Sequence, residues 1–157
     1  MSKILMLYAS ITGNTEEIAV AIADMLQKYN HEVTMKTFDM HAIDVAEFNH
    51  YDAILVGTYS WDDGAMPYEV EDFYDELEDA DLTGKLVGVF GSGDSFYATF
   101  GGAIELLGQR FEELGADVMP DWIVVDLEPG AKDFERCQKF AGDLSVRLLD
   151  GVEEAAE

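Results

Sequence analysis

The feature that most constrains the fold is a regular alternation of short apolar runs with longer amphipathic stretches. Four runs have the length and composition of buried strands: ILML at 4–7, AILVG at 53–57, LVGVFG at 86–91 and WIVV at 122–125. A fifth run, 32–38, alternates apolar and polar residues, as a strand at a sheet edge does. Strands that alternate with helices form parallel β-α-β units with right-handed crossovers. We therefore predict an α/β fold, a doubly wound five-stranded parallel sheet with helices on both faces.

Four stretches between and after these strands carry apolar residues at helical spacing. Residues 39–50 favour at most one further short helix. The length of 157 residues fits a single domain, which we place at 1–150, and we expect the tail at 151–157 to fray. The stripes are Ile18, Ile22, Met25, Leu26 and Tyr29; Val70, Phe73, Tyr74 and Leu77; Ile104, Leu107, Phe111 and Leu114; and Phe134, Cys137, Ala141, Leu144 and Leu148.

Charge narrows the range of partners. The chain has 33 acidic and 9 basic residues, a net charge of −24. Nucleic acids and anionic membranes bind through positive charge on the protein, so both are excluded as partners. Soluble proteins with basic faces are favoured, and an acidic surface kept only for solubility is the alternative. The run EVEDFYDELEDAD at 69–81 predicts an amphipathic helix whose acidic face serves either docking or solvation.

The cysteine, the histidines and the N-terminal residues indicate where the protein is located and which kinds of site it can form. The one cysteine, Cys137, excludes an internal disulfide and lies on a predicted core face, which favours a buried structural thiol. The three histidines are too scattered for a metal site. No apolar run approaches the ~20 residues that cross a bilayer, and the start MSKILMLYAS lacks the features of a signal peptide. We expect a cytoplasmic protein.

Ligands of a parallel sheet bind beyond the carboxyl ends of its strands. Three unusual loops leave predicted strand ends, at 10–15, 58–69 and 91–102. The loop DLEPG at 126–130 is ordinary by comparison.

The first loop, SITGNT, joins a strand to a helix start and holds no lysine, arginine or histidine. Its hydroxyls and amide are hydrogen-bond donors, its glycine allows close approach of the backbone, and the helix start carries a partial positive charge. This combination predicts a site for a monophosphate that stays bound. A loop for phosphoryl transfer has lysine after the glycine, where Asn14 stands. An ordinary helix-capping loop is the alternative.

The second and third loops are rich in aromatic residues. Tyr59 and Trp61 lie in the second loop, and Phe96, Tyr97 and Phe100 lie among glycines in the third. Aromatic side chains on strand-end loops favour stacking on a flat ligand, and packing against one another is the alternative. The third loop lacks the last glycine of a dinucleotide fingerprint.

Along nearly its whole length the chain resembles the flavodoxins, specifically the short-chain group. ASITGNTEEIA resembles their phosphate loop, and TYSWDDG and GSGDSFYATFGGA resemble their two flavin-flanking loops. The last strand region, ADVMPDWIVVDLEPG, lacks the insertion that marks the long-chain group. The resemblance implies the strand order 2-1-3-4-5, which is taken from the family and not deduced from the residues.

The resemblance also implies one noncovalently bound FMN. The phosphate would lie on the first loop, Thr58 and Ser60 would add hydroxyls, Trp61 and Tyr97 would sandwich the ring system, and Ser92, Gly93 and Asp94 would line its pyrimidine edge. The full set of implied FMN-binding residues is Ser10, Ile11, Thr12, Gly13, Asn14, Thr15, Thr58, Tyr59, Ser60, Trp61, Asp62, Asp63, Ser92, Gly93, Asp94, Tyr97 and Phe100.

The implied function is low-potential electron transfer between a reductase and acceptor proteins that dock through basic surfaces. The flavin performs the redox chemistry, so the resemblance implies a monomeric carrier with no catalytic side chain and no metal. A neutral phosphate loop in acidic surroundings keeps the reduced cofactor a strong electron donor. In many flavodoxins glycine follows the loop tryptophan. Asp62 stands there instead, and we expect it to disfavour the backbone flip that stabilises the one-electron-reduced flavin.

Three other classes share parts of this pattern. One is a flavodoxin-like activator of a metal-cofactor enzyme. Another is a flavin-dependent NAD(P)H or quinone reductase, which needs room over the flavin that Trp61 and Tyr97 would deny. A phosphorylatable receiver domain would carry acidic residues after its first strand, where this chain has Ser10 and Thr12.

Overall fold

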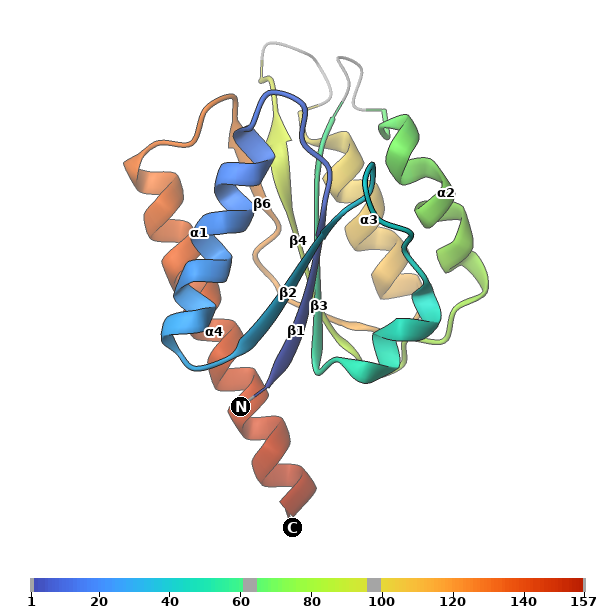
Figure 1. Cartoon of the computed structure of the whole chain (residues 1–157), viewed down its shortest axis with the longest axis vertical. Coiled ribbons are helices and arrows are strands. Elements are labelled where there is room, and N and C mark those ends of the chain that lie inside the picture. The colour runs from blue at the N-terminus through green and yellow to red at the C-terminus, as the bar shows by residue number, and fades with distance from the viewer. Residues whose placement is uncertain (1, 61–64, 96–99, 157) are drawn as a thin grey trace.

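The apolar runs build one parallel sheet. The computed structural model describes residues 2–60, 65–95 and 100–156, with side chains through Leu149. The strands are β1 (Lys3–Tyr8), β2 (Glu32–Thr37), β3 (Ala53–Tyr59), β4 (Leu86–Gly93), β5 (Asp117–Val118) and β6 (Ile123–Asp126). The order is β2-β1-β3-β4-β5, with β6 also paired to β4, and every pairing is parallel. The predicted fold class and strand order are confirmed, with β2 at an edge (Figure 1).

The opposite edge differs from the prediction of one strand at 122–125. Two short strands share this edge: β5 pairs with the beginning of β4, and β6 pairs with its end. Pro120 lies between them and has no N–H to donate to a ladder. The sixth strand is therefore a short piece of one interrupted edge.

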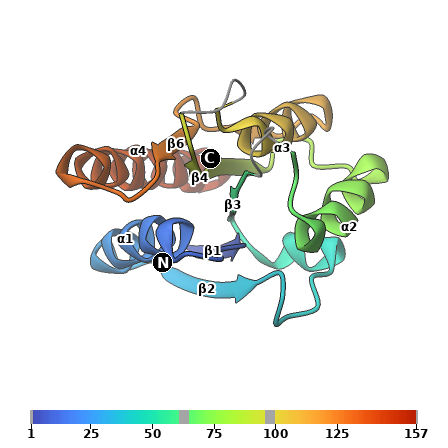
Figure 2. The same cartoon turned by 90° about the horizontal axis from the view of Figure 1, so that it is seen from above.

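Helices cover both faces of the sheet, as Figure 2 shows from above. They are α1 (Asn14–Lys28), the 3₁₀ helix η1 (Val45–His50), α2 (Tyr68–Glu76), the 3₁₀ helix η2 (Leu77–Asp79), α3 (Gly102–Glu113) and α4 (Ala131–Ala156). α1 and α4 pack against one face, and η1, α2 and α3 against the other, so the core consists of two buried clusters separated by the sheet. The short helix expected within 39–50 is η1.

The predicted stripes face these clusters, with three corrections. Phe134 belongs to neither cluster and instead lines a groove between α1 and α4. Tyr29 is 46% exposed because it follows the last turn of α1. Phe140 of α4, which is not part of the predicted stripe, is fully buried. Its ring fills the space beside Gly88. Cys137 is buried, and burial raises the pKa of its thiol to about 11, which fits a structural residue.

None of the described helices is both long and apolar enough to cross a bilayer. The helix α4 extends to Ala156, and the fraying of residues 151–157 stays a prediction.

Candidate functional site

A cavity of about 280 Å³ opens at the carboxyl ends of β1, β3 and β4. These strand ends lie at the top of the sheet in Figure 1. This is the end of a parallel sheet where ligands bind. All three predicted strand-end loops contribute to it. The described lining residues are Ser10, Ile11, Thr12, Asn14, Thr15, Tyr59, Ser60, Ser92, Gly93, Asp94 and Leu127, and all but Leu127 were predicted from the sequence.

The first loop turns sharply from β1 into α1. The N–H of Ala9 donates to the carbonyl of Gly57 at 3.0 Å, so the ladder continues one residue past β1. Gly13 caps α1 with a φ of 94°, a left-handed conformation that favours glycine. A Cβ on Gly13 would meet nothing within 4 Å, so conformation and not space selects glycine here. The N–H groups of the first turn of α1 therefore lie beside the cavity without helical acceptors.

Hydroxyl groups tie the first loop to the helix start and to the third loop. The Ser10 hydroxyl accepts the N–H of Glu16 at 3.3 Å, which leaves its own hydrogen for another acceptor. The hydroxyls of Thr15 and Ser92, both buried, are 2.8 Å apart. Since only one hydroxyl can donate within that pair, the other keeps a hydrogen to donate elsewhere.

The cavity offers hydrogen-bond donors to an anion, but its described lining contains no cation. Among the described lining residues Asp94 is the one charged side chain, and none is lysine or arginine. The positive end of the α1 dipole and the hydroxyl hydrogens would supply the attraction for an anion. Such a set of donors suits a phosphate that is held and not transferred.

The second loop is anchored by hydrogen bonds to two helices, α3 and α2. The Ser60 hydroxyl accepts the N–H of Ala103 at 3.1 Å, in the first turn of α3. The Tyr59 hydroxyl donates to Glu69 in α2 at 2.7 Å. Burial, then that hydrogen bond to Glu69, raises the pKa of Tyr59. Thr58 does not line the cavity: it is fully buried, and its hydroxyl donates to the Tyr59 carbonyl at 2.9 Å.

The loop at 126–130, which sequence reasoning set aside as ordinary, contributes Leu127. This side chain is 53% exposed, and its N–H donates to the carbonyl of Gly93 at 2.8 Å. The preceding Asp126 accepts hydrogen bonds from the N–H and hydroxyl of Ser95, which lower its pKa and hold the start of the third loop. An apolar residue in a polar strand-end loop was the signal that sequence reasoning missed.

Two other predicted residues lie near the cavity without lining it. Gly13 lines a neighbouring groove between α1 and the start of α4. Phe100 is 39% exposed, and its ring would be 3.3 Å from a Cβ placed on Gly93. Trp61, Asp62, Asp63 and Tyr97 lie outside the described residues, so the predicted stacking and the expectation for Asp62 stay predictions.

Comparisons with known proteins agree with this geometry. A sequence model of the flavodoxin family matches residues 6–140. The chain is 40% identical to probable flavodoxin 1 of Bacillus subtilis (strain 168) over 142 residues. This alignment covers 90% of this chain and 89% of that protein. The oxidised flavodoxin 1 of Bacillus cereus superimposes with a TM-score of 0.87 at 38% identity, over 93% of this chain and 98% of the other. A short-chain flavodoxin associated with a PDU bacterial microcompartment gives a TM-score of 0.88 at 40% identity, over 94% and 99% of the two chains.

Proposed function

Because the chain belongs to the flavodoxin family, whose members carry electrons on FMN, we propose that the cavity at the carboxyl ends of β1, β3 and β4 holds the FMN phosphate. The protein is an FMN-dependent electron-transfer flavoprotein. The observation that supports the placement best is the donor set of the first loop, which combines a helix start with free hydroxyl hydrogens and no cation.

The residues fit a phosphate monoester. Ser10, Thr12 and Asn14 provide side-chain donors around the start of α1, and the pair of Thr15 and Ser92 provides one more hydroxyl hydrogen. A dianionic phosphate needs several donors, and charge-assisted hydrogen bonds are stronger than neutral ones. Ser60, Gly93 and Asp94, which line the other side of the cavity, would contact the remainder of the cofactor.

The bound flavin would supply the electron-transfer chemistry, and the protein would bind it, orient it and set its potential. The lack of a cation in the described lining of the cavity favours a low potential, because a positive neighbour would stabilise the anionic reduced flavin. We propose no catalytic side chain for this site, and therefore an electron carrier instead of an enzyme.

We place the carrier in the cytoplasm, as a monomer between a flavin-containing reductase and acceptor proteins. The net charge of −24 supports partners with basic docking surfaces. The acidic residues of α2, which begins beside the second loop, are one part of that surface.

Titration of FMN into the FMN-free protein, followed by flavin fluorescence, tests the proposal. One FMN per chain should bind with strong quenching. In an anaerobic titration with dithionite the bound flavin should be reduced, and a basic c-type cytochrome should reoxidise it. Absence of FMN binding would end the proposal. Steady oxidation of NAD(P)H by the isolated protein would instead support a reductase.

A further inference from the structure

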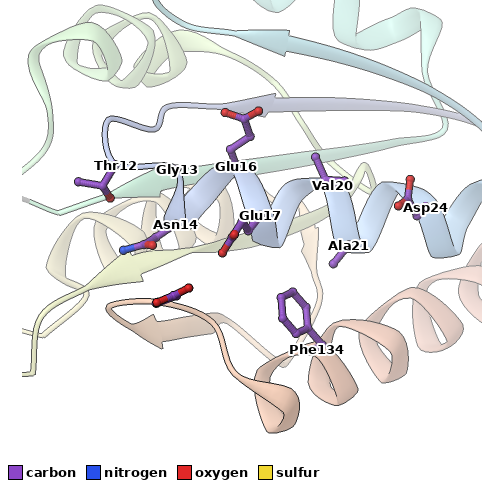
Figure 3. A pocket seen from close by; sticks show the side chains of 10 residues that line it. Thr12, Gly13, Asn14, Glu16, Glu17, Val20, Ala21, Asp24 and Phe134 are labelled. Atoms are coloured by element: carbon purple, nitrogen blue, oxygen red, sulfur yellow. The ribbon is translucent and has the colours of Figure 1, made fainter.

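Outside the cavity, a groove of about 780 Å³ lies between α1 and the start of α4. Figure 3 shows Phe134, in the first turns of α4, pointing towards α1, with Ala21 and Glu17 on the facing side of α1. Val20, which is 41% exposed, also lines the groove, but it points away from Phe134 in Figure 3. The groove therefore offers apolar contact to whatever occupies it.

The rim of the groove is acidic. Four of its described lining residues carry carboxylates, and none is lysine or arginine: Glu16, Glu17, Asp24 and Glu128. An occupant therefore carries positive charge and also has an apolar portion. The long side chains of lysine and arginine combine these two properties, because an aliphatic stem leads to a charged head.

A metal ion does not fit the arrangement of the carboxylates. Across the described part of the chain, no group of three or more His, Cys, Asp or Glu side chains is arranged to hold one. The carboxylates are instead distributed along the groove, so they suit several separate positive groups or one extended chain.

The groove adjoins the cavity. Thr12 and Asn14 line both, so an occupant of the groove contacts the loop to which we assign the phosphate. We propose that this groove is a docking site for basic side chains of a redox-partner protein, which insert their apolar stems against Phe134 and Ala21 and pair with the rim carboxylates. This inference rests on the proposed function and adds a second docking element to the acidic face of α2.

The test uses the FMN-loaded protein and a basic c-type cytochrome as the probe, with dissociation constants measured by calorimetry at low ionic strength. The variant Glu17→Gln, Asp24→Asn, Glu128→Gln removes three groove charges and changes no residue that lines the cavity. The matched control, Glu32→Gln, Glu78→Gln, Glu112→Gln, removes three exposed charges near the amino ends of the strands or the far end of α3. Each exposed ion pair contributes modestly, so we expect about a tenfold weaker complex for the groove variant and much less change for the control.

Two further readouts separate the groove from general charge effects. Phe134→Ser keeps every charge, removes the apolar ring from the groove and should also weaken the complex. In titrations of ¹⁵N-labelled protein, amide shifts at Val20, Ala21 and Phe134 should move with the cytochrome. Equal losses for both triple variants, with no shifts in the groove, would overturn the proposal.

A small polycation is the competing occupant. If spermidine binding weakens in the groove variant while cytochrome binding does not, the groove takes small polycations and the docking proposal is wrong. FMN titration of the same variants separates this result from the proposed function. Normal FMN binding with an unaffected complex refutes only the docking site, whereas no FMN binding by the parent protein refutes the proposed function.

Discussion

The polar groups at the two ends of the sheet differ in their hydrogen bonding. At the amino ends, polar groups of the turns bind other protein groups. The Asp52 carboxylate accepts the N–H of Lys3 at 2.7 Å, and the Lys85 ammonium donates to the Tyr51 carbonyl at 2.7 Å. At the carboxyl ends, the Ser10 hydroxyl and one hydroxyl of the pair Thr15 and Ser92 border a cavity with a hydrogen still to donate. Hydroxyl hydrogens that border a cavity and are still free to donate mark a place where a ligand can complete the hydrogen bonding.

The largest expected effect is on the free energy of unfolding, when one methyl group is added at each end of the sheet. A Cβ on Gly91, near the carboxyl end of β4, would be 1.9 Å from the Thr58 carbonyl oxygen and 2.6 Å from Ile104. Gly91→Ala should therefore destabilise the FMN-free protein by about 3 kcal/mol, the upper range for overpacking. Gly84 lies in the turn before β4, has a φ of 76° and would meet nothing within 4 Å, so Gly84→Ala should cost only about 1 kcal/mol of backbone strain.

Urea unfolding of the two FMN-free variants measures both losses. Equal losses would show that the backbone at the carboxyl end is no more tightly packed than the turn at the other end.

A second pair removes one hydroxyl from each end. Thr15→Val deletes the partner of Ser92, and we expect it to weaken FMN binding by about 1.5 kcal/mol, the lower range for a hydrogen bond to a charged group. Thr83→Val deletes a hydroxyl that donates to Asp81 in an exposed turn at the amino end, and FMN affinity should not change. Fluorescence titration with FMN gives both values. A loss of affinity in the Thr83 variant, or none in the Thr15 variant, would remove the distinction between the ends.

The smallest expected effect concerns pH and the amino end. The His31 Nε2 is 2.9 Å from the Ser145 hydroxyl of α4, and the His31 Nδ1 is buried with no hydrogen-bond partner among the described residues. Burial, with a smaller contribution from the N-terminal amino group, lowers the pKa of His31, although Asp52 opposes this shift. A lowered pKa means that the folded state favours the neutral ring, so this stability is present above the ordinary value of ~6.5 and is lost as pH falls below it.

Thermal unfolding at about pH 8 and about pH 5.5, either side of the ordinary histidine pKa, measures this contribution. His31→Gln should reduce the loss of stability on acidification, whereas His50→Gln, at an exposed position, should not. If His31→Gln also changes the pH dependence of FMN affinity, the two ends of the sheet are coupled and the comparison between them fails.

Much of the fold and the position of the first loop were predictable from the sequence, because they depend on local patterns of residues. Apolar runs such as 53–57 can be covered only inside a sheet flanked by helices, and the donors at 10–15 follow a strand directly, so their location at a strand end follows from their order in the chain. The interruption of the last strand at Pro120 depends on pairing with β4, which the sequence does not display.

Other parts of the site depend on contacts between distant residues. Thr58 and Ser60 both looked like hydroxyl donors, yet the Thr58 hydroxyl donates to the backbone while Ser60 lines the cavity. Leu127 reaches the cavity because its N–H binds the Gly93 carbonyl, 34 positions earlier in the chain (127 − 93). The groove between α1 and α4 likewise requires the two helices to be side by side on the sheet, which Figure 2 shows and no local pattern reveals.

The central claim is that the carboxyl-end cavity holds the phosphate of FMN by neutral donors alone. Comparing the dissociation constants of FMN and riboflavin for the same FMN-free protein tests it most directly, because the two ligands differ only in the phosphate. Several charge-assisted hydrogen bonds predict that FMN binds at least about a hundredfold more tightly. Equal affinities for the two ligands would contradict the claim.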